Sequence, residues 1–440
     1  MLPSSQSDRY EIGPEARARF QDRVRAQLYS HILPFWCGPA LNAVHGGWMP
    51  WLSNNLQPDF SKPQGLILNA RLLWTFSAVY LARPEPMHRR MAERAFEIVL
   101  GKFWDNEHGG AVWRLDNQWR VLDDSKKTYG QAFCIYALAE YHRAFGSELA
   151  RARAIELFEL LETYAHDPVN GGYVEVCARN WTEAGPGARL SEKDMPERKS
   201  MNCHLHVLEA FTNLYRIWPD RRVAARLREL VELFETRILD RSTFHLRHFF
   251  NDAWEARSDT YTFGHDIEAS WLLCEAADTL AEPQLFGSVR PLALRMAETT
   301  LDEGVDTDGG LVYEGRAGRI VDSGKEWWPQ AEAVVGFINA YQISGDEQYL
   351  GAALRVWEFI EGKVVDRVHG EWYWRIGPDG KPDNTLPKVS EWKDPYHAVR
   401  ACLEVLRRLG SGGAARYGPV VGPESFGNSG GPASLSRRGR

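Results

Sequence analysis

Two kinds of helical pattern alternate along the chain. One is amphipathic, with apolar residues at the three- and four-residue spacing of a single helix face, and it occurs at 14–33, 157–164 and 227–238. The other is apolar nearly all round, which predicts helices that are buried on most sides. The second kind occupies residues 66–82, 131–145, 204–217, 266–280, 329–343 and 397–409.

A glycine turn that runs into aromatic residues precedes each buried helix. It reads HGGW at 45–48, EHGGAVW at 107–113, NGGYVEV at 170–176, DGGLVYE at 308–314 and HGEWYW at 369–374. A degenerate copy without glycine, HLRHFF, lies at 245–250. Neighbouring copies are about 60 residues apart, as Gly109 and Gly171 are. The sequence therefore predicts six copies of one helix–turn–helix unit.

Six amphipathic and six buried helices in alternation predict an all-α fold. We expect an (α/α)6 barrel (a toroid), with the buried helices as an inner ring and the glycine turns as short β-hairpins or loops at one pole. A solenoid of stacked helix pairs is the alternative, but no polar capping unit is evident. Residues 1–409 are thus expected to form a single catalytic domain. Residues 410–440 are rich in Gly, Ser and Pro, which predicts a disordered tail.

Composition narrows the class of protein. The net charge of −7 gives no support for a nucleic-acid partner. No apolar segment follows the N-terminus, and the longest apolar run contains Asn69 and Arg71, so neither a signal peptide nor a membrane span is expected. The six cysteines lack metal-ligand spacing, which indicates free thiols in a reducing compartment. We expect a cytoplasmic protein that is a monomer or weak dimer.

The inner helices of such a ring run in the same direction, so their N-termini meet at one pole. Each helix carries polar or stacking side chains near that end, and histidines packed at random in a core would not recur in this register. These side chains are Arg71, Tyr129, Asn202, His204, His206, His265, Glu268, Trp327, Trp328, Trp392, Tyr396 and His397.

These residue types favour proton transfer on a sugar. Histidines, an arginine and few carboxylates suit a proton transfer beside an oxyanion, and tryptophans stack on sugar rings. Helix N-termini add positive potential. Removal of the C2 proton of an aldose gives an enediolate, and two bases on opposite faces could return the proton to the other side. His265 and Glu268, three residues apart, share one helix face. Taken alone, the pair would fit a structural role, with the carboxylate complementing the helix dipole and the histidine packing in the core.

Six segments resemble the N-acylglucosamine 2-epimerase superfamily, and are most similar to its cellobiose 2-epimerase branch. They are GLILNARLLWTFSA, TYGQAFCIYALAEY, MNCHLHVLEAFTNLY, GHDIEASWLL, EWWPQAE and PYHAVRACLE, within roughly residues 15–410. The resemblance implies an (α/α)6 barrel and an aldose 2-epimerase that inverts C2 of the reducing-end glucose of cellobiose and related β-1,4 disaccharides. It implies a sugar substrate and no cofactor or metal.

The resemblance also implies roles for individual residues. His265 and His397 would be the general acid/base pair, and Glu268 would support proton transfer or ring opening. Arg71 and His206 would stabilise the enediolate. The implied sugar-binding residues are Tyr129, Asp194, Asn202, Trp327 and Trp392.

Several alternatives remain open at this point. A mannose isomerase or monosaccharide 2-epimerase would use the same chemistry, a glycoside hydrolase would need two carboxylic acids such as Glu268 and Glu332, and a non-catalytic protein would only bind sugar. A metal site at His265 and Glu268 is disfavoured because Arg71 would compete with the ion. His204 faces either the pocket or the outer ring. The remaining histidines, His245 and His248 among them, are expected in surface, turn or packing positions.

Overall fold

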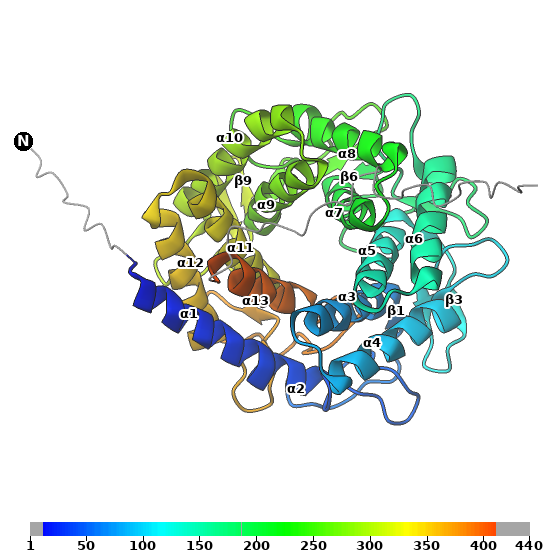
Figure 1. Ribbon diagram of the computed structural model, residues 1–440, viewed down its shortest axis with the longest axis horizontal. Helices are drawn as coiled ribbons and strands as arrows, with labels where there is room; N and C mark the ends of the chain where they lie inside the picture. Colours follow the sequence, from blue (N-terminus) through cyan, green and yellow to red (C-terminus); the bar gives the residue numbers. More distant parts are fainter. Residues whose placement is uncertain (1–11, 186, 411–440) are drawn as a thin grey trace, which may run out of the picture.

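The computed structural model describes residues 12–185 and 187–410, so the predicted tail lies outside the described residues apart from Gly410. Within these ranges two concentric layers of helices surround a central axis (Figure 1). The inner helices are α3 (Leu66–Ala82), α5 (Thr128–Phe145), α7 (Met201–Ile217), α9 (Phe263–Leu280), α11 (Trp327–Ser344) and α13 (Tyr396–Leu409). The outer helices are α1 (Pro14–Gln27), α4 (Pro86–Ile98), α6 (Glu148–Leu160), α8 (Arg221–Leu233), α10 (Pro283–Thr299) and α12 (Glu347–Phe359).

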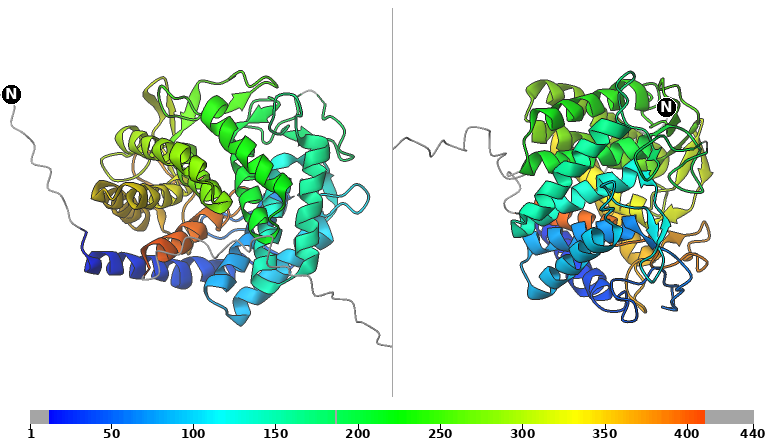
Figure 2. Two further views of the ribbon diagram at one scale, coloured as in Figure 1. Left: turned by 45° about the horizontal axis from the view of Figure 1, so that its top comes forward. Right: turned by 90° about the vertical axis from the view of Figure 1, so that its right-hand side faces the viewer.

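The ring is closed. Each inner helix packs on the next, and α13 packs on α3, so the last repeat meets the first. The outer helix α1 lies along α13 and joins the two ends of the chain (Figures 1 and 2). The prediction of an (α/α)6 barrel is therefore confirmed, and the solenoid alternative is wrong.

Every outer helix is followed by a five-residue π-helical turn. The π turns are η1 (Leu28–Ile32), η2 (Val99–Phe103), η3 (Leu161–Ala165), η4 (Phe234–Ile238), η5 (Thr300–Gly304) and η6 (Ile360–Val364), and the short α2 (Leu33–Trp36) follows η1. A single π turn often marks a functional site. Here the turn recurs in all six repeats, so it belongs to the architecture.

The glycine turns form a hairpin in each repeat, as predicted. The same antiparallel bridge closes each one: Leu41↔Trp48, Trp104↔Ala111, His166↔Tyr173, Leu239↔Leu246, Val305↔Leu311 and Val365↔Trp372. The fourth bridge belongs to the degenerate copy, where Phe244 takes the left-handed backbone (φ 62°) that glycine takes in the others. The degenerate segment is thus a true sixth repeat.

Short antiparallel strands continue the hairpins on one side of the ring, as the side view in Figure 2 shows. They are β1 (Gln64–Gly65), β2 (Arg114–Leu115), β3 (Val121–Asp123), β4 (Lys126–Lys127), β5 (Val176–Cys177), β6 (Lys199–Ser200), β7 (Phe249–Phe250), β8 (Thr260–Thr262), β9 (Glu314–Arg316), β10 (Arg319–Asp322), β11 (Lys325–Glu326) and β12 (Arg375–Ile376). They pair as β1-β2-β3, β10-β9-β8, β11-β12, β4-β5 and β6-β7. The return strand leads directly into the inner helix, so α5, α7 and α9 each begin three residues before their predicted starts.

A repeated ion pair fixes the hairpins to the inner ring. In four repeats, the aspartate that opens the turn binds a lysine that precedes the next inner helix. The pairs are Lys126–Asp105 (3.0 Å), Lys199–Asp167 (2.7 Å), Lys325–Asp306 (2.8 Å) and Lys388–Asp366 (2.6 Å). The four lysines are nearly inaccessible, and Asp105 and Asp366 are buried as well, so at least those two pairs are protected from screening by water and salt.

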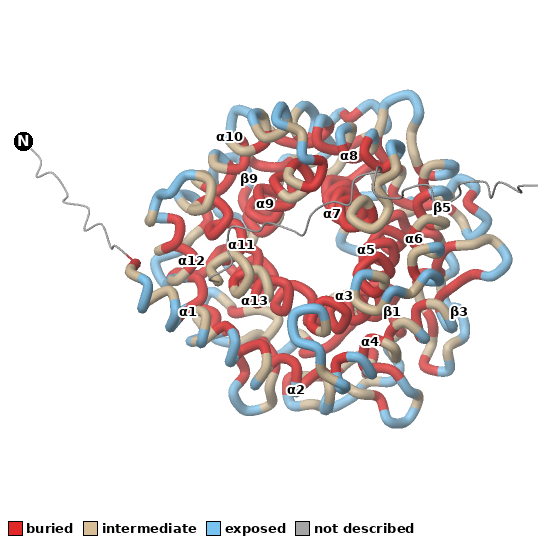
Figure 3. The backbone as a smooth tube through the Cα atoms, viewed as in Figure 1, coloured by how far each residue is buried: buried red, intermediate tan, exposed pale blue. Residues whose placement is uncertain are grey.

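The core lies between the two layers of helices. The inner helices are buried along most of their length, whereas the outer helices expose one face (Figure 3). The six cysteines are free thiols, as expected. Among the described residues, no helix is both long and apolar enough to cross a membrane.

Candidate active site

A cavity of about 360 Å³ opens at the pole where the inner helices begin. All ten site residues predicted from the sequence line it: Arg71, Tyr129, Asp194, Asn202, His206, His265, Glu268, Trp327, Trp392 and His397. They reach it because the inner helices run in the same direction and present their first turns to one space. The structure thus brings the whole predicted set together.

A larger cavity, about 810 Å³, opens at the opposite pole, where the inner helices end. Its walls include Arg143, Arg216 and Arg400, each of which is ion-paired with a glutamate. None of the predicted site residues lines it. The smaller cavity is therefore the candidate active site.

His265 lies in the first turn of α9. Its Nδ1 atom is 2.5 Å from the Thr262 hydroxyl, so the ring can offer only Nε2 to a ligand in the cavity. Burial, together with neighbouring histidines, holds the pKa of His265 well below its ordinary range. The ring is therefore neutral at pH 7 and able to accept a proton.

His397 lies in the first turn of α13 and has a different partner. Its Nδ1 atom is 2.6 Å from a carboxylate oxygen of Glu332, which again leaves Nε2 for a ligand. Burial and the cations Arg71 and Arg400 lower the pKa of His397. The Trp328 ring lies close to both histidines, with centroid distances of 4.7 Å to His265 and 5.5 Å to His397. Two neutral imidazoles thus flank one indole at the cavity.

Arg71 and His206 add polar groups to the cavity wall. The Arg71 guanidinium donates to Asp394 (3.0 Å) and to the Tyr129 hydroxyl (2.9 Å), and its flat face lies against Phe133. Burial alone would disfavour its charge, but Tyr129 and Asp394 outweigh burial and raise the pKa of Arg71. Arg71 is a fixed cation, as its position in an apolar helix requires.

His206 is held by a residue on its own helix. Its Nδ1 atom is 2.9 Å from Glu209, three residues on in α7. Burial lowers the pKa of His206, partly offset by that hydrogen bond. The ring is thus oriented and neutral.

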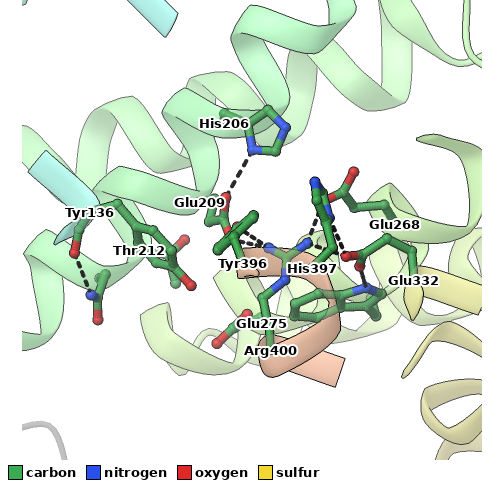
Figure 4. Close-up of polar contacts among 12 residues, drawn as sticks. Tyr136, His206, Glu209, Thr212, Glu268, Glu275, Glu332, Tyr396, His397 and Arg400 are labelled. Atoms are coloured by element: carbon green, nitrogen blue, oxygen red, sulfur yellow. Dashed lines mark hydrogen bonds and ion pairs between the residues drawn. The ribbon is translucent and has the colours of Figure 1, made fainter. Parts of the chain in front are cut away.

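Beneath the histidines lies a buried charged layer centred on Arg400 (Figure 4). Its guanidinium bonds to Glu209 and Glu268 and lies 2.7 Å from Glu332. Burial and the nearby charge of Glu332 raise the pKa of Glu268 to about 8. Although burial opposes it, Arg400 lowers the pKa of Glu209 to about 2. One cation therefore serves three carboxyl groups, and Glu268 is the group that keeps a proton at neutral pH.

The same layer bears on metal binding. Ligand atoms of Glu268, Glu332 and His397 lie within 4.8 Å of one another, a spacing that a metal ion could use. Arg400 already places a positive charge on both carboxylates. Arg71, the cation expected to compete with a metal ion, is paired with Asp394, and the cation bound to these two glutamates is Arg400.

Aromatic and polar groups form the outer wall of the cavity. Trp327, Trp328, Trp374 and Trp392 line it, and the segment 190–194 covers one side. The Lys127 ammonium donates to the carbonyl of Leu190 (2.8 Å), which anchors that segment. The Asn202 amide oxygen and the Trp327 indole nitrogen are buried without a hydrogen-bond partner among the described residues. Flat faces and unsatisfied polar atoms of this kind suit a hydroxylated ring.

Sequence reasoning missed the carboxylates. It expected few at this pole and named Glu332 only for the hydrolase alternative, whereas Glu209, Glu332 and Asp394 each hold a cation or a histidine. Charged residues inside nearly apolar inner helices were the available signal, because such a group needs a buried partner. Glu332 does not line the cavity, so it supports His397 from behind.

The structure also decides the role of His204. Its Nε2 accepts the backbone N–H of Tyr173 (2.8 Å), just as Gln131 accepts from Ala111 (2.8 Å) in the preceding repeat. His204 therefore fixes a hairpin and faces away from the cavity. Trp327 and Trp328, by contrast, both line it.

Comparison with known proteins supports the assignment of the fold. Residues 47–401 match the model of the N-acylglucosamine 2-epimerase (GlcNAc 2-epimerase) family. The chain belongs to this family. It is 40% identical to the cellobiose 2-epimerase of Bacteroides fragilis over 388 residues, which cover 88% of this chain and 98% of that one.

The chain is also similar to a solved cellobiose 2-epimerase and, more distantly, to a D-mannose isomerase. The solved structure of the Bacillus thermoamylovorans cellobiose 2-epimerase superposes with a TM-score of 0.84 at 36% identity, and the match covers 89% of this chain and all of that one. The D-mannose isomerase of Marinomonas mediterranea is 25% identical over 83% of this chain and 92% of its own. The protein is thus a carbohydrate 2-epimerase of the cellobiose 2-epimerase type.

Proposed function

We propose that the enzyme inverts C2 of the reducing-end glucose of cellobiose and related β-1,4 disaccharides. The observation that carries this proposal is the pair of neutral imidazoles, His265 and His397, on two inner helices beside one cavity. Each has its Nδ1 engaged, so each offers Nε2 to the sugar. Two such groups can act on opposite faces of a bound enediolate.

The reaction begins with the open-chain aldehyde. One histidine takes the C2 proton, the electrons of the broken C–H bond form a C1=C2 double bond, and the carbonyl π electrons move onto oxygen to give the enediolate. The other histidine, which must hold a proton on Nε2 at this stage, then delivers that proton to the opposite face of C2 while the carbonyl re-forms, so the two histidines exchange protonation states in each turnover. Arg71 and His206 stabilise the oxyanion, and Glu268, with a pKa near 8, supplies a proton during ring opening.

The sugar-binding residues would be Tyr129, Asp194, Asn202, Trp327 and Trp392, all of which line the cavity. A disaccharide is favoured over a monosaccharide by the higher identity to the B. fragilis cellobiose 2-epimerase than to the mannose isomerase. Hydrolysis is disfavoured because Glu332 lies outside the cavity and both Glu268 and Glu332 are bound to Arg400. No metal or cofactor is part of the proposed reaction.

The test is a proton NMR time course with cellobiose in deuterium oxide. We expect the reducing-end glucose to convert to mannose, with deuterium at C2 of the product. Arg71→Ala is the matched control, and it should fold normally but abolish turnover. Conversion of mannose to fructose with no action on cellobiose would favour a mannose isomerase, release of glucose would indicate a hydrolase, and binding without turnover would indicate a non-catalytic protein.

A further inference from the structure

The fourth hairpin, whose glycines are replaced, carries two histidines that the proposed reaction does not use. His245 takes the place of the second glycine of the turn, and His248 follows it by three residues. His245 bonds through Nδ1 to Asp266 (2.7 Å), whose other oxygen accepts the backbone N–H of Leu246 (2.8 Å). His245 thus helps to fix the start of α9, on which His265 lies.

The repeat register places His248 at a hairpin position that lines the cavity in two other repeats. It lies two residues after the residue that forms the bridge of its hairpin. The equivalent residues of the next two repeats are Tyr313 and Trp374, and both line the cavity. His248 itself does not line the cavity, so any effect it has on the site passes through the residues that it contacts.

His248 is connected to His265 through Thr262, the residue before α9. The Thr262 hydroxyl oxygen is 2.5 Å from His265 Nδ1 and 3.5 Å from His248 Nε2. The two imidazole rings meet edge to face, with centroids 5.8 Å apart. The three side chains form a short chain that leads away from the cavity.

A hydroxyl group has one proton, and its direction determines the tautomer of His265. If Thr262 donates to His248, its lone pair accepts Nδ1–H of His265, and Nε2 of His265 is left as a base. If Thr262 donates to His265 instead, Nε2 carries the proton and cannot accept another. An acceptor at His248 is therefore what directs the hydroxyl proton away from His265.

We propose that His248 and Thr262 are positioning residues that hold His265 in the tautomer with Nε2 free to accept the C2 proton. The catalytic consequence of this tautomer rests on the proposed function. It also makes the two bases unequal. His397 is backed by a carboxylate, which stabilises the imidazolium it becomes, whereas His265 is backed by a neutral hydroxyl. His265 is thus the partner that returns its proton more readily.

The first test uses the full-length protein without sugar. Nitrogen-15 NMR of histidine-labelled protein reports which ring nitrogen is protonated, and a His265→Gln sample identifies the resonance. We expect His265 in the Nδ1–H form in the wild type, in Thr262→Ser and in His248→Gln. All three proteins keep the hydrogen bonds that link residues 248, 262 and 265. Thr262→Val and His248→Phe should move it toward the Nε2–H form.

The second test is the rate of C2 proton exchange in deuterium oxide. Thr262→Val and His248→Phe should lose on the order of tenfold or more in kcat with little change in KM, because a misdirected tautomer removes part of a general base. Thr262→Ser and His248→Gln should stay within a few-fold of the wild type.

The outcomes separate the two proposals. An Nε2–H form of His265 in the wild type, or an unchanged tautomer and rate in Thr262→Val, would overturn the positioning role. The expected tautomers in an enzyme that exchanges no C2 proton on any sugar would support the hydrogen-bond chain and overturn the proposed function. The tautomer of His265 in the wild type can overturn the positioning role without any variant at position 248 or 262. The test therefore does not depend on the folding of those variants.

Discussion

Replacing Arg400 with methionine removes the one guanidinium that bonds to Glu209, Glu268 and Glu332 together. Arg400 is 2% exposed and the three glutamates no more than 3%, so water cannot replace the lost charge. Methionine is apolar and of similar length, so it fills much of the space. The substitution therefore tests charge with limited change in packing.

Removing one partner of a buried ion pair costs about 3–5 kcal/mol, because the other charge is left uncompensated. Here the glutamates can respond by binding protons, so the cost depends on pH. Without Arg400 the folded-state pKa of each glutamate rises: that of Glu209 climbs from about 2, and those of Glu268 and Glu332 move further above the unfolded value near 4.5. The folded variant then holds protons that the unfolded chain releases, and its stability falls as pH rises above about 4.5. We expect the full loss at pH 8 and a clearly smaller loss at pH 5.

The assay is denaturant unfolding of wild type and variant at pH 5 and pH 8, followed by tryptophan fluorescence and circular dichroism. A double variant, Arg400→Met with Glu209→Gln, is the matched control. It removes one of the uncompensated carboxylates, so it should recover part of the loss at pH 8 and little at pH 5. Equal losses at both pH values, or no recovery in the double variant, would refute the charge argument and leave only a packing effect.

Three further predictions concern the cavity. Asp394→Asn removes the charged partner of Arg71 (3.0 Å) and should lower kcat on cellobiose about tenfold with little change in KM, as measured by steady-state kinetics; a change in KM alone would count against it. Trp392→Ala should impair cellobiose more than mannose, and equal losses would exclude a second-sugar contact. Glu268→Gln should flatten the dependence of melting temperature on pH between 5 and 8. The wild-type pKa near 8 lies above the unfolded value of 4.5, so wild-type stability falls as pH rises through that window, whereas glutamine does not titrate; an unchanged slope would argue against a protonated Glu268.

Local patterns were enough to predict the architecture of this protein. The alternation of amphipathic and apolar helices and the recurring glycine turn are properties of neighbouring residues, so they can be read along the chain. The predicted span of α3, residues 66–82, matches the structure, and the degenerate turn near Leu246 proved to be a hairpin like the others. Because helices that run in one direction bring their first turns together, the register also placed His265 and His397 at one cavity.

What the sequence could not decide is which buried charges meet. Arg71 and Asp394 are 323 residues apart, and Arg400 and Glu209 are 191 apart. A charged residue in an apolar helix signals that a partner exists, but no spacing rule names it. Closure of the ring chooses the partner of Arg71, because only then does α13 lie against α3 and bring Arg71 and Asp394 together. The sequence by itself thus determined the ring and the pole, and only the tertiary structure decided how the charges are paired within it.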